Sequence, residues 1–298
     1  MSDDILLTLA PVTHDLGGFK VHRTLPHKQR TMVGPFIFFD QMGPAHFSAG
    51  QGIDVRPHPH INLSTVTFLF SGAMMHRDSI GSRQKIEPGA VNLMTAGRGI
   101  THSERSPADE RATGSHMSGI QTWLAMPKAK EEMAPAFEHT AEADLPVVEV
   151  DGTEVRLIMG EGWGAASPVT CHAPTLYASI VIPPGGSFEV PADADERALY
   201  LLDGDVTVGG TPIEPQNLVL LAPGHKPVLK SRDAARLMLC GGAPMDGERH
   251  VWWNFVSSSR ERINEAKRAW KAGEFALPPG DDDEWIPLPE IPMTVSYP

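Results

Sequence analysis

Strand-like segments of this chain recur in an internal repeat, which strongly limits the folds that it can adopt. Residues 86–94 resemble residues 213–221, and residues 68–72 resemble residues 200–204. The matching segments are 127 and 132 residues apart and follow the same order along the chain. Matches at a nearly constant offset favour a duplicated structural unit. We therefore expect two copies of one β domain, for which a length of 298 residues is sufficient.

Short strands are expected throughout both copies. The chain contains 28 glycines and 27 prolines, which divide it into short segments at frequent turns. Segments rich in β-branched and aromatic residues between such turns predict strands, and many short strands are typical of sandwiches and barrels. The fold class is therefore expected to be all-β. The expected strands are 63–70, 91–94, 120–125, 155–158, 176–182, 199–202, 218–221 and 237–239.

Helical patterning is convincing only near the C-terminus. The serines at 257–259 can cap a helix over residues 260–271, in which Ile263, Ala266 and Trp270 share one face. Beyond this helix, prolines and acidic residues over 278–298 predict an extended, irregular chain.

The strand pattern is interrupted between residues 126 and 144, where a proline and several charged residues occur. A composition change of this kind is typical of a domain boundary. We expect an N-terminal domain over residues 1–135, a C-terminal domain over 136–250, and a helix with an extended tail over 251–298.

Composition and charge exclude several classes of protein. The 25 basic and 37 acidic side chains give a net charge of −12, without the basic cluster on which direct nucleic-acid binding depends. The longest apolar runs are far shorter than the roughly 20 residues of a membrane span. The N-terminus has no secretory signal, so a cytoplasmic location is expected. Cys171 and Cys240 lack metal or redox spacing and are expected to be small core residues.

Two pairs of polar residues predict a metal site. His58 and His60 precede an expected strand, and side chains two residues apart in an extended segment lie on the same face. A glycine-rich turn over residues 95–99 leads to a second such pair, His102 and Glu104. Three imidazoles and one carboxylate suit a divalent first-row metal, Fe(II) above all, and leave up to two positions for oxygen, water or a chelating substrate.

The second copy of the repeat provides an internal control. Aligning Gly72 with Gly204 places Val190 and Ala192 opposite the first pair, and aligning Gly97 with Gly224 places Leu229 and Ser231 opposite the second pair. Residues required only by the fold would be expected in both copies. The four N-terminal residues are therefore assigned to function, and only the N-terminal domain is expected to bind metal.

Other histidines leave two interpretations open. His76 and His116 either line the pocket or donate to the ligands from outside, or they are ordinary surface or hydrogen-bonded side chains.

The predicted ligands lie in motifs of a known family. The spacing of Gly52, His58, His60 and Gly72 resembles the first motif of cupins, although the usual glutamate is replaced at position 64 or 65. The role of that glutamate is moved to Glu104. This relocation, together with the sequence Thr-Ala-Gly-Arg-Gly-Ile at 95–100, resembles the pirin family, and the resemblance covers nearly the whole chain. A departure from the family occurs at residues 61–64, where many pirins have Arg-Gly-Phe-Glu.

The resemblance implies a bicupin, in which two antiparallel, jelly-roll-like β-barrels lie face to face and a C-terminal α-helix packs outside. It also implies one iron ion, held in the N-terminal barrel by His58, His60, His102 and Glu104. Some bacterial pirins resemble quercetin 2,3-dioxygenases, in which a metal-bound flavonol reacts with O₂, its central ring opens, and carbon monoxide leaves with a depside. In such an enzyme Glu104 would be the base that takes the flavonol hydroxyl proton.

We therefore expect a metal-dependent dioxygenase that acts on an aromatic flavonol or enol-like small molecule and O₂. Mammalian pirins resemble iron-dependent co-regulators, so the alternative is a redox-responsive regulatory protein that binds a protein partner. A sugar- or nucleotide-isomerase cupin is a third possibility, which the moved glutamate disfavours. The chain has no heptad pattern or long exposed apolar face, so we expect a monomer.

Overall fold

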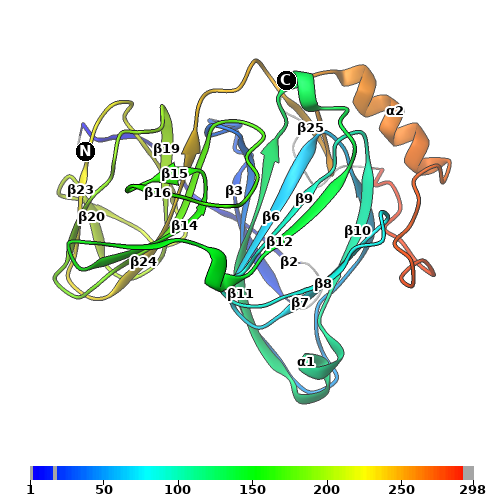
Figure 1. Cartoon of the computed structure of the whole chain (residues 1–298), viewed down its shortest axis with the longest axis horizontal. Helices are drawn as coiled ribbons and strands as arrows, with labels where there is room; N and C mark the ends of the chain where they lie inside the picture. The colour runs from blue at the N-terminus through cyan, green and yellow to red at the C-terminus, as the bar shows by residue number, and fades with distance from the viewer. Residues whose placement is uncertain (1–2, 16–18, 291–298) are drawn as a thin grey trace. The chain divides into compact units, whose positions relative to one another are not determined.

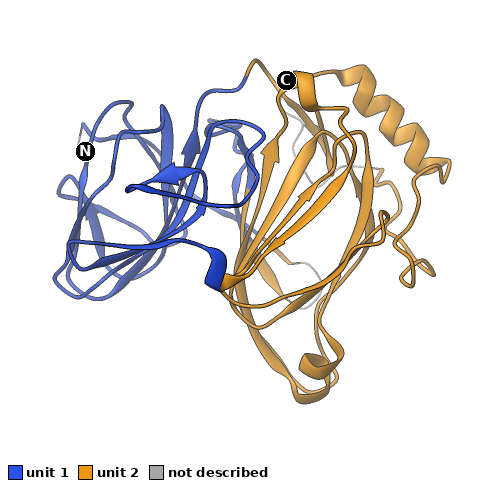
Figure 2. Ribbon diagram, viewed as in Figure 1, with its two compact units in different colours: residues 1–13, 22–38, 143–245 blue, residues 14–21, 39–142, 246–298 orange. Residues whose placement is uncertain are grey.

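The described chain, residues 3–15 and 19–290 of the computed structural model, is built mainly of β-strands (Figure 1). It divides into two compact units (Figure 2). Unit 1 comprises residues up to 13, 22–38 and 143–245, and unit 2 comprises residues 14–21, 39–142 and 246 onward. The expected domains are continuous stretches of chain, whereas each unit contains three segments. Strand pairing between distant segments explains the difference, because β1 (Ile5–Leu9) pairs with β22 (Leu218–Leu221).

Two sheets provide the strands around the predicted site. The seven-stranded sheet has the order β12 (Ala136–Thr140), β9 (Val91–Thr95), β6 (Leu63–Ser71), β11 (Ser115–Ala125), β4 (Phe36–Phe47), β3 (Lys20–Leu25) and β2 (Val12–Asp15). The four-stranded sheet has the order β5 (Asp54–His60), β10 (Ile100–Arg105), β7 (Met74–Asp78) and β8 (Arg83–Ile86). Neighbouring strands β5, β10 and β7 are antiparallel, so alternate side chains of all three face the same side.

Unit 1 repeats this arrangement. Its seven-stranded sheet has the order β1, β22, β19 (Glu196–Asp203), β24 (Ala235–Gly242), β17 (Thr175–Ile182), β14 (Thr153–Met159) and β13 (Val147–Val150). Its four-stranded sheet has the order β18 (Ser187–Glu189), β23 (Val228–Ser231), β20 (Val206–Val208) and β21 (Thr211–Ile213). Four neighbouring strands of the unit 2 sheet correspond in sheet order and chain order to four strands of the unit 1 sheet: β9, β6, β11 and β4 to β22, β19, β24 and β17. The two four-stranded sheets correspond in the same way over all four strands. The expected duplication of an antiparallel β domain is confirmed.

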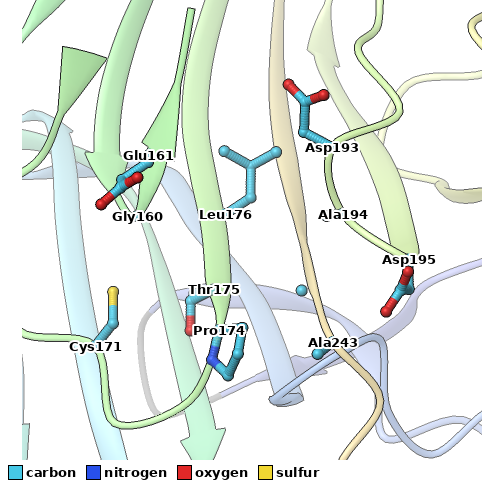
Figure 3. Close-up of a pocket in the computed structure, with 11 residues that line it drawn as sticks. Gly160, Glu161, Cys171, Pro174, Thr175, Leu176, Asp193, Ala194, Asp195 and Ala243 are labelled. Carbon is cyan, nitrogen blue, oxygen red and sulfur yellow. The ribbon is translucent and has the colours of Figure 1, made fainter. Parts of the chain in front are cut away.

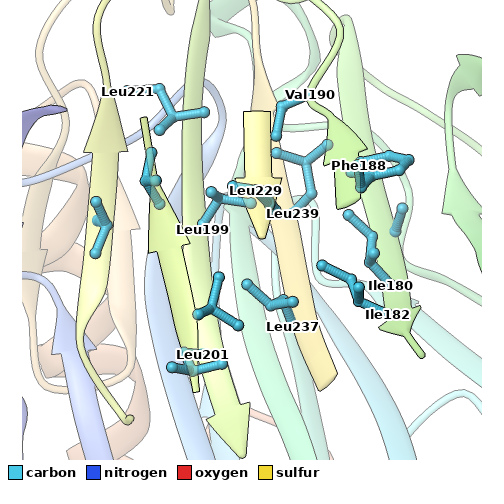
Figure 4. Close-up of a cluster of buried hydrophobic side chains, with 14 of the residues drawn as sticks. Ile180, Ile182, Phe188, Val190, Leu199, Leu201, Leu221, Leu229, Leu237 and Leu239 are labelled. Atoms are coloured by element: carbon cyan, nitrogen blue, oxygen red, sulfur yellow. The ribbon is translucent and has the colours of Figure 1, made fainter. Parts of the chain in front are cut away.

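An apolar core fills the space between the two sheets of unit 1 (Figure 4). Alternate residues of β17, among them Ile180 and Ile182, pack against Leu229 of β23 and Val190 beyond β18. Val190 and Leu229 are the residues that the sequence alignment places opposite His58 and His102. In the strand register, however, Leu229 pairs with Phe188 as His102 pairs with His58, so Phe188 stands at the position of His58. Apolar side chains thus occupy the interior of unit 1 where unit 2 has imidazoles.

The local predictions agree closely with the structure. The eight expected strands lie within β6, β9, β11, β14, β17, β19, β22 and β24. The expected helix is α2 (Arg260–Lys271), where Ser259 Oγ accepts a hydrogen bond from the backbone N–H of Arg262 and the three predicted apolar residues are buried. The expected irregular segment has no helix or strand over 278–290, and residues 291–298 lie outside the described part of the chain.

The remaining elements are short. They are α1 (Ala108–Thr113), the single-turn helices η1 (Lys128–Lys130) and η2 (Glu142–Asp144), and the strand pairs β15 (Glu161–Gly162) with β16 (Ala165–Ala166) and β25 (His250–Trp252) with β26 (Phe255–Ser257). None of the helices in the described residues is both long enough and apolar enough to span a membrane.

Candidate metal centre

Three of the predicted ligands lie on adjacent strands of unit 2. His58 and His60 are at the end of β5, and His102 on β10 is the register partner of His58. The nearest ring nitrogens of these three residues, which we call the histidine cluster, lie within 4.8 Å of one another. The Nε2 atoms of His60 and His102 are 3.1 Å apart. Strand pairing therefore converts two distant sequence motifs into one compact group of ligand atoms.

Hydrogen bonds to the backbone orient two of these rings. Nδ1 of His58 is 2.9 Å from the carbonyl oxygen of Arg56, and Nδ1 of His60 is 3.0 Å from the carbonyl oxygen of Asn254. Because a carbonyl oxygen can only accept, each Nδ1 carries the proton. The Nε2 atom of each neutral ring is then left with the lone pair that a metal requires.

Burial keeps the histidine cluster in its neutral, ligating form. Removal from water lowers the pKa of His58 to about 4. The pKa values of His60 and His102 are held well below their usual range by burial and by the neighbouring imidazoles. Since a protonated imidazole cannot bind a cation, these shifts leave the ligand atoms available at neutral pH.

Glu104 is buried on the same strand as His102 but follows a register irregularity in the pairing of β10 with β5. Its Oε1 accepts a hydrogen bond of 2.6 Å from Nε2 of Gln121 on β11. Among the described residues, the group of atoms within 4.8 Å of one another holds the three histidines and not this carboxylate. Burial raises the pKa of Glu104 to about 7, although the hydrogen bond from Gln121 acts in the opposite direction. A carboxylate role at the metal therefore stays a prediction.

His76 and His116, whose roles the sequence leaves undecided, have different surroundings. His76 on β7 is buried, and its Nδ1 lies 3.4 Å from Nδ1 of His102. His116 is exposed and lies 3.1 Å from the imidazole of His46. His76 thus contacts a predicted ligand, whereas His116 belongs to a surface pair.

Some neighbours of the cluster were not predicted from the sequence. Gln121 contacts Glu104 from the other sheet of unit 2, and Asn254 contacts His60 from the turn between β25 and β26, 194 residues away in the chain. Trp123 presents an edge-on ring contact to His60 at a centroid distance of 5.0 Å. The sequence carries no local pattern that marks these residues, because their contacts arise only when β11 and the β25–β26 turn approach the four-stranded sheet.

A separate pocket of about 400 Å³ lies in unit 1 (Figure 3). Its lining includes Glu161, Asp193 and Asp195, together with Cys171. All of these residues belong to unit 1, whereas the histidine cluster belongs to unit 2. The pocket therefore does not contain the predicted metal ligands.

Comparison with known proteins identifies the family. The family model described as Pirin matches residues 18–124, and that described as Pirin C-terminal cupin domain matches residues 177–276. A pirin-like protein of Caulobacter vibrioides is 48% identical over 279 residues, which are 93% of this chain and 96% of that protein. The chain belongs to the pirin family.

Two other relatives of this pirin bear the name of an enzyme. A Pseudomonas aeruginosa protein, provisionally named a quercetin 2,3-dioxygenase, is 40% identical over 260 residues, which are 87% of this chain and 81% of that protein. The crystal structure of quercetin 2,3-dioxygenase from Acinetobacter baumannii has a TM-score of 0.90 and 35% sequence identity, and the match covers 98% of this chain and 97% of that one. The expected pirin resemblance and two-cupin fold are confirmed.

The departure from the family at residues 61–64 has a structural counterpart in this pirin. Asn62 adopts a φ of 55°, a left-handed conformation that glycine and asparagine tolerate best. Its Nδ2 donates to the carbonyl oxygen of Glu131 at 2.7 Å and to the carboxylate of Glu132 at 2.9 Å. Asparagine is therefore compatible with a turn where many pirins have glycine, and it adds hydrogen bonds beside the histidine cluster.

Proposed function

We propose that this pirin is a metal-dependent dioxygenase that acts on a flavonol or an enol-like aromatic substrate with O₂. The observation that carries the proposal is the buried histidine cluster, whose ring nitrogens converge within 4.8 Å. The likeness to a quercetin 2,3-dioxygenase over nearly the whole chain supports the choice of reaction.

The chemistry of the donor set fits one divalent metal ion. His58, His60 and His102 provide neutral imidazole nitrogens, and Glu104 is the carboxylate available from the same strand. A site with three nitrogen ligands and one oxygen ligand suits Fe(II), which we propose as the cofactor. The metal, when bound, would act as a Lewis acid on the substrate hydroxyl and hold substrate and O₂ together.

The protein side of the reaction is assigned to Glu104. Gln121 holds Oε1, so Oε2 is the oxygen that would ligate the metal and that, on leaving it, would take the proton of the flavonol hydroxyl. Burial raises the pKa of Glu104 to about 7 in the metal-free protein, and a bound cation would lower it, so the carboxylate would be in the ionised form that accepts a proton. In the overall reaction one O₂ is consumed and one carbon monoxide is released for each flavonol converted to its depside.

Oxygen consumption and carbon monoxide release with quercetin test this proposal directly. Protein reconstituted with Fe(II) is expected to turn over, and His58→Ala protein treated identically is not, because it lacks one ligand of the cluster. Glu104→Gln protein that retains iron is expected to lose turnover. Full turnover by that iron-loaded variant would reject the base role.

The same assay discriminates the proposed enzyme from a regulatory protein. Wild-type protein that is fully loaded with iron but leaves quercetin unchanged would reject the dioxygenase proposal. Recovery of a stoichiometric protein partner by the Fe(III) form alone would then support iron-dependent regulation.

A further inference from the structure

His76 and Asp78 are two buried polar residues to which the proposed reaction assigns no role. Both lie on β7, next to β10, where Asp78 is the register partner of His102 and His76 is the partner of Glu104. His76 is 4% exposed and Asp78 is fully buried. Polar side chains are costly to bury unless they form hydrogen bonds, so the groups to which His76 and Asp78 are hydrogen-bonded must be identified.

The carboxylate of Asp78 is fixed by the turn that follows β7. Its Oδ1 accepts hydrogen bonds from the backbone N–H groups of Ile80 at 3.1 Å and Ser82 at 2.9 Å. Its Oδ2 lies 3.0 Å from Nε2 of His76. An ionised carboxylate can only accept hydrogen bonds, so the proton of the last bond belongs to Nε2 of His76.

This assignment determines what His76 presents to the metal centre. A neutral imidazole with its proton on Nε2 has a lone pair on Nδ1, and that atom lies 3.4 Å from Nδ1 of His102. The ring is further held by Phe137, which stacks on it at a centroid distance of 4.4 Å and an interplanar angle of 19°. His76 is thus oriented as an acceptor for a proton on Nδ1 of His102.

The three members of the histidine cluster therefore differ in how they are oriented. His58 and His60 donate from Nδ1 to backbone carbonyl groups. His102 faces His60 with Nε2 and faces a side chain, His76, with Nδ1. Side-chain substitutions can remove the acceptor of His102 without altering the backbone acceptors of the other two ligands.

We propose that Asp78 and His76 are positioning residues that keep the proton of His102 on Nδ1, so that its Nε2 binds the metal. Hydrogen-bonded partners of this kind fix the tautomer and the ring orientation of a metal-binding histidine. The inference rests on the metal site of the proposed function, but it does not depend on the substrate or the reaction.

The variant Asp78→Asn tests the direction of these hydrogen bonds. Its amide oxygen can still accept from Ile80 and Ser82, but its NH₂ group now faces Nε2 of His76 and donates to it. His76 must then carry its proton on Nδ1, where it opposes the proton of His102. We expect Zn(II) affinity, measured by competition with a chromophoric chelator, to fall about 10–100-fold, the range typical for loss of such a partner.

Two substitutions of His76 separate a positioning role from a general effect on packing. His76→Leu removes the acceptor and is expected to weaken Zn(II) binding as Asp78→Asn does. His76→Asn restores an acceptor oxygen close to the former position of Nδ1 and is expected to recover most of the affinity. His139→Leu is the matched control, because His139 bonds to Asn92 at 2.7 Å and has no assigned role at the cluster.

Imidazole ¹⁵N NMR of the Zn(II)-loaded protein provides a second measurement that does not depend on activity. His76 is expected to carry its proton on Nε2 in the wild type and on Nδ1 in Asp78→Asn. A wild-type His76 protonated on Nδ1, or unchanged Zn(II) affinity in both Asp78→Asn and His76→Leu, would overturn the inference.

Wild-type protein that does not bind Zn(II) would overturn the inference together with the metal site. Failure of quercetin turnover with normal Zn(II) binding would reject only the reaction, and the affinity of Asp78→Asn would still decide the inference.

Discussion

Gln121 donates a hydrogen bond of 2.6 Å to Glu104 across the space between β11 and β10. The bond joins the two sheets of unit 2 at the carboxylate that follows His102. Burial and this bond act on the pKa of Glu104 in opposite directions, and burial is the larger effect, because the pKa is raised from 4.5 to about 7.

The raised pKa of Glu104 predicts how the stability of the metal-free protein depends on pH. Between about pH 4.5 and pH 7 the unfolded chain loses the Glu104 proton while the folded chain retains it, so stability falls as the pH rises through this window. The shift corresponds to an order of magnitude of about 3 kcal/mol. Metal-free Glu104→Gln is therefore expected to exceed the wild type by about 1–3 kcal/mol in the free energy of unfolding at pH 8, and by much less at pH 5. Urea unfolding of both proteins at pH 5 and pH 8 measures these free energies. The same difference between variant and wild type at the two pH values would contradict the prediction.

The contact of Asp281 with β10 predicts a pH dependence of opposite sign. Its carboxylate accepts from Nε and Nη2 of Arg105, each at 2.8 Å, and from Ser103 Oγ at 2.6 Å. Burial acts to raise the pKa of Asp281, but these hydrogen bonds hold it below its usual range. The interaction therefore contributes stability above the unfolded pKa of about 4 and loses it as the pH falls through the folded value.

Asp281→Asn is expected to cost about 1–3 kcal/mol at pH 7, because a charge-assisted bidentate pair is lost. The difference from the wild type should diminish below about pH 4. Unfolding by denaturant across this pH range measures it, with Asp282→Asn as the neighbouring control. A cost that is constant with pH would argue that packing, not charge, is responsible.

The apolar interior of unit 1 predicts a loss of stability without a loss of metal. Leu229→Ala removes a fully buried side chain from the core and is expected to cost about 2–5 kcal/mol. Zinc stoichiometry should stay that of the wild type, since the ligands lie in unit 2. Thermal unfolding and metal analysis of the same preparation test both parts, and one lost metal per chain would contradict the assignment of the site.

A buried ion pair beside the start of α2 predicts a large effect in unit 2. Arg249 Nε lies 3.0 Å from Glu131 Oε1, and the Arg249 side chain is fully buried. Glu131→Leu removes this buried carboxylate and the two hydrogen bonds that it accepts from Ser258, and leaves Asp246 as the remaining carboxylate partner of Arg249. The expected cost is about 3 kcal/mol. Asp205→Asn, which breaks the exposed pair with Arg232, is the control and should cost at most about 1 kcal/mol. Similar unfolding free energies for the two variants would reject the distinction.

Much of the local structure could be predicted from the sequence because its causes are local. The helix α2 has the predicted bounds, since a serine cap and the spacing of Ile263, Ala266 and Trp270 act within a few residues. The strands β6, β17 and β24 followed from runs of β-branched and aliphatic residues between turns. The three histidines were found for the same reason, because alternate residues of a strand share one face.

The partners of these residues could not be predicted in that way. Gln121 reaches Glu104 only because β11 and β10 belong to sheets that enclose the same interior, and Asn254 reaches His60 across 194 residues of sequence. The pairing of β1 with β22 likewise joins the first strand to a sheet formed late in the chain. Contacts of this kind depend on the closure of sheets, which leaves no periodic pattern in either segment.

Patterns along the chain are sufficient to predict the all-β class, the duplicated domain, the C-terminal helix and the histidines of the cluster. The short distances between the ring nitrogens, the hydrogen bonds that link Asp78, His76 and His102, and the raised pKa of Glu104 arise only in the folded molecule. Strand and helix preferences depend on neighbours along the chain, whereas hydrogen-bond direction and desolvation depend on groups brought together from distant strands.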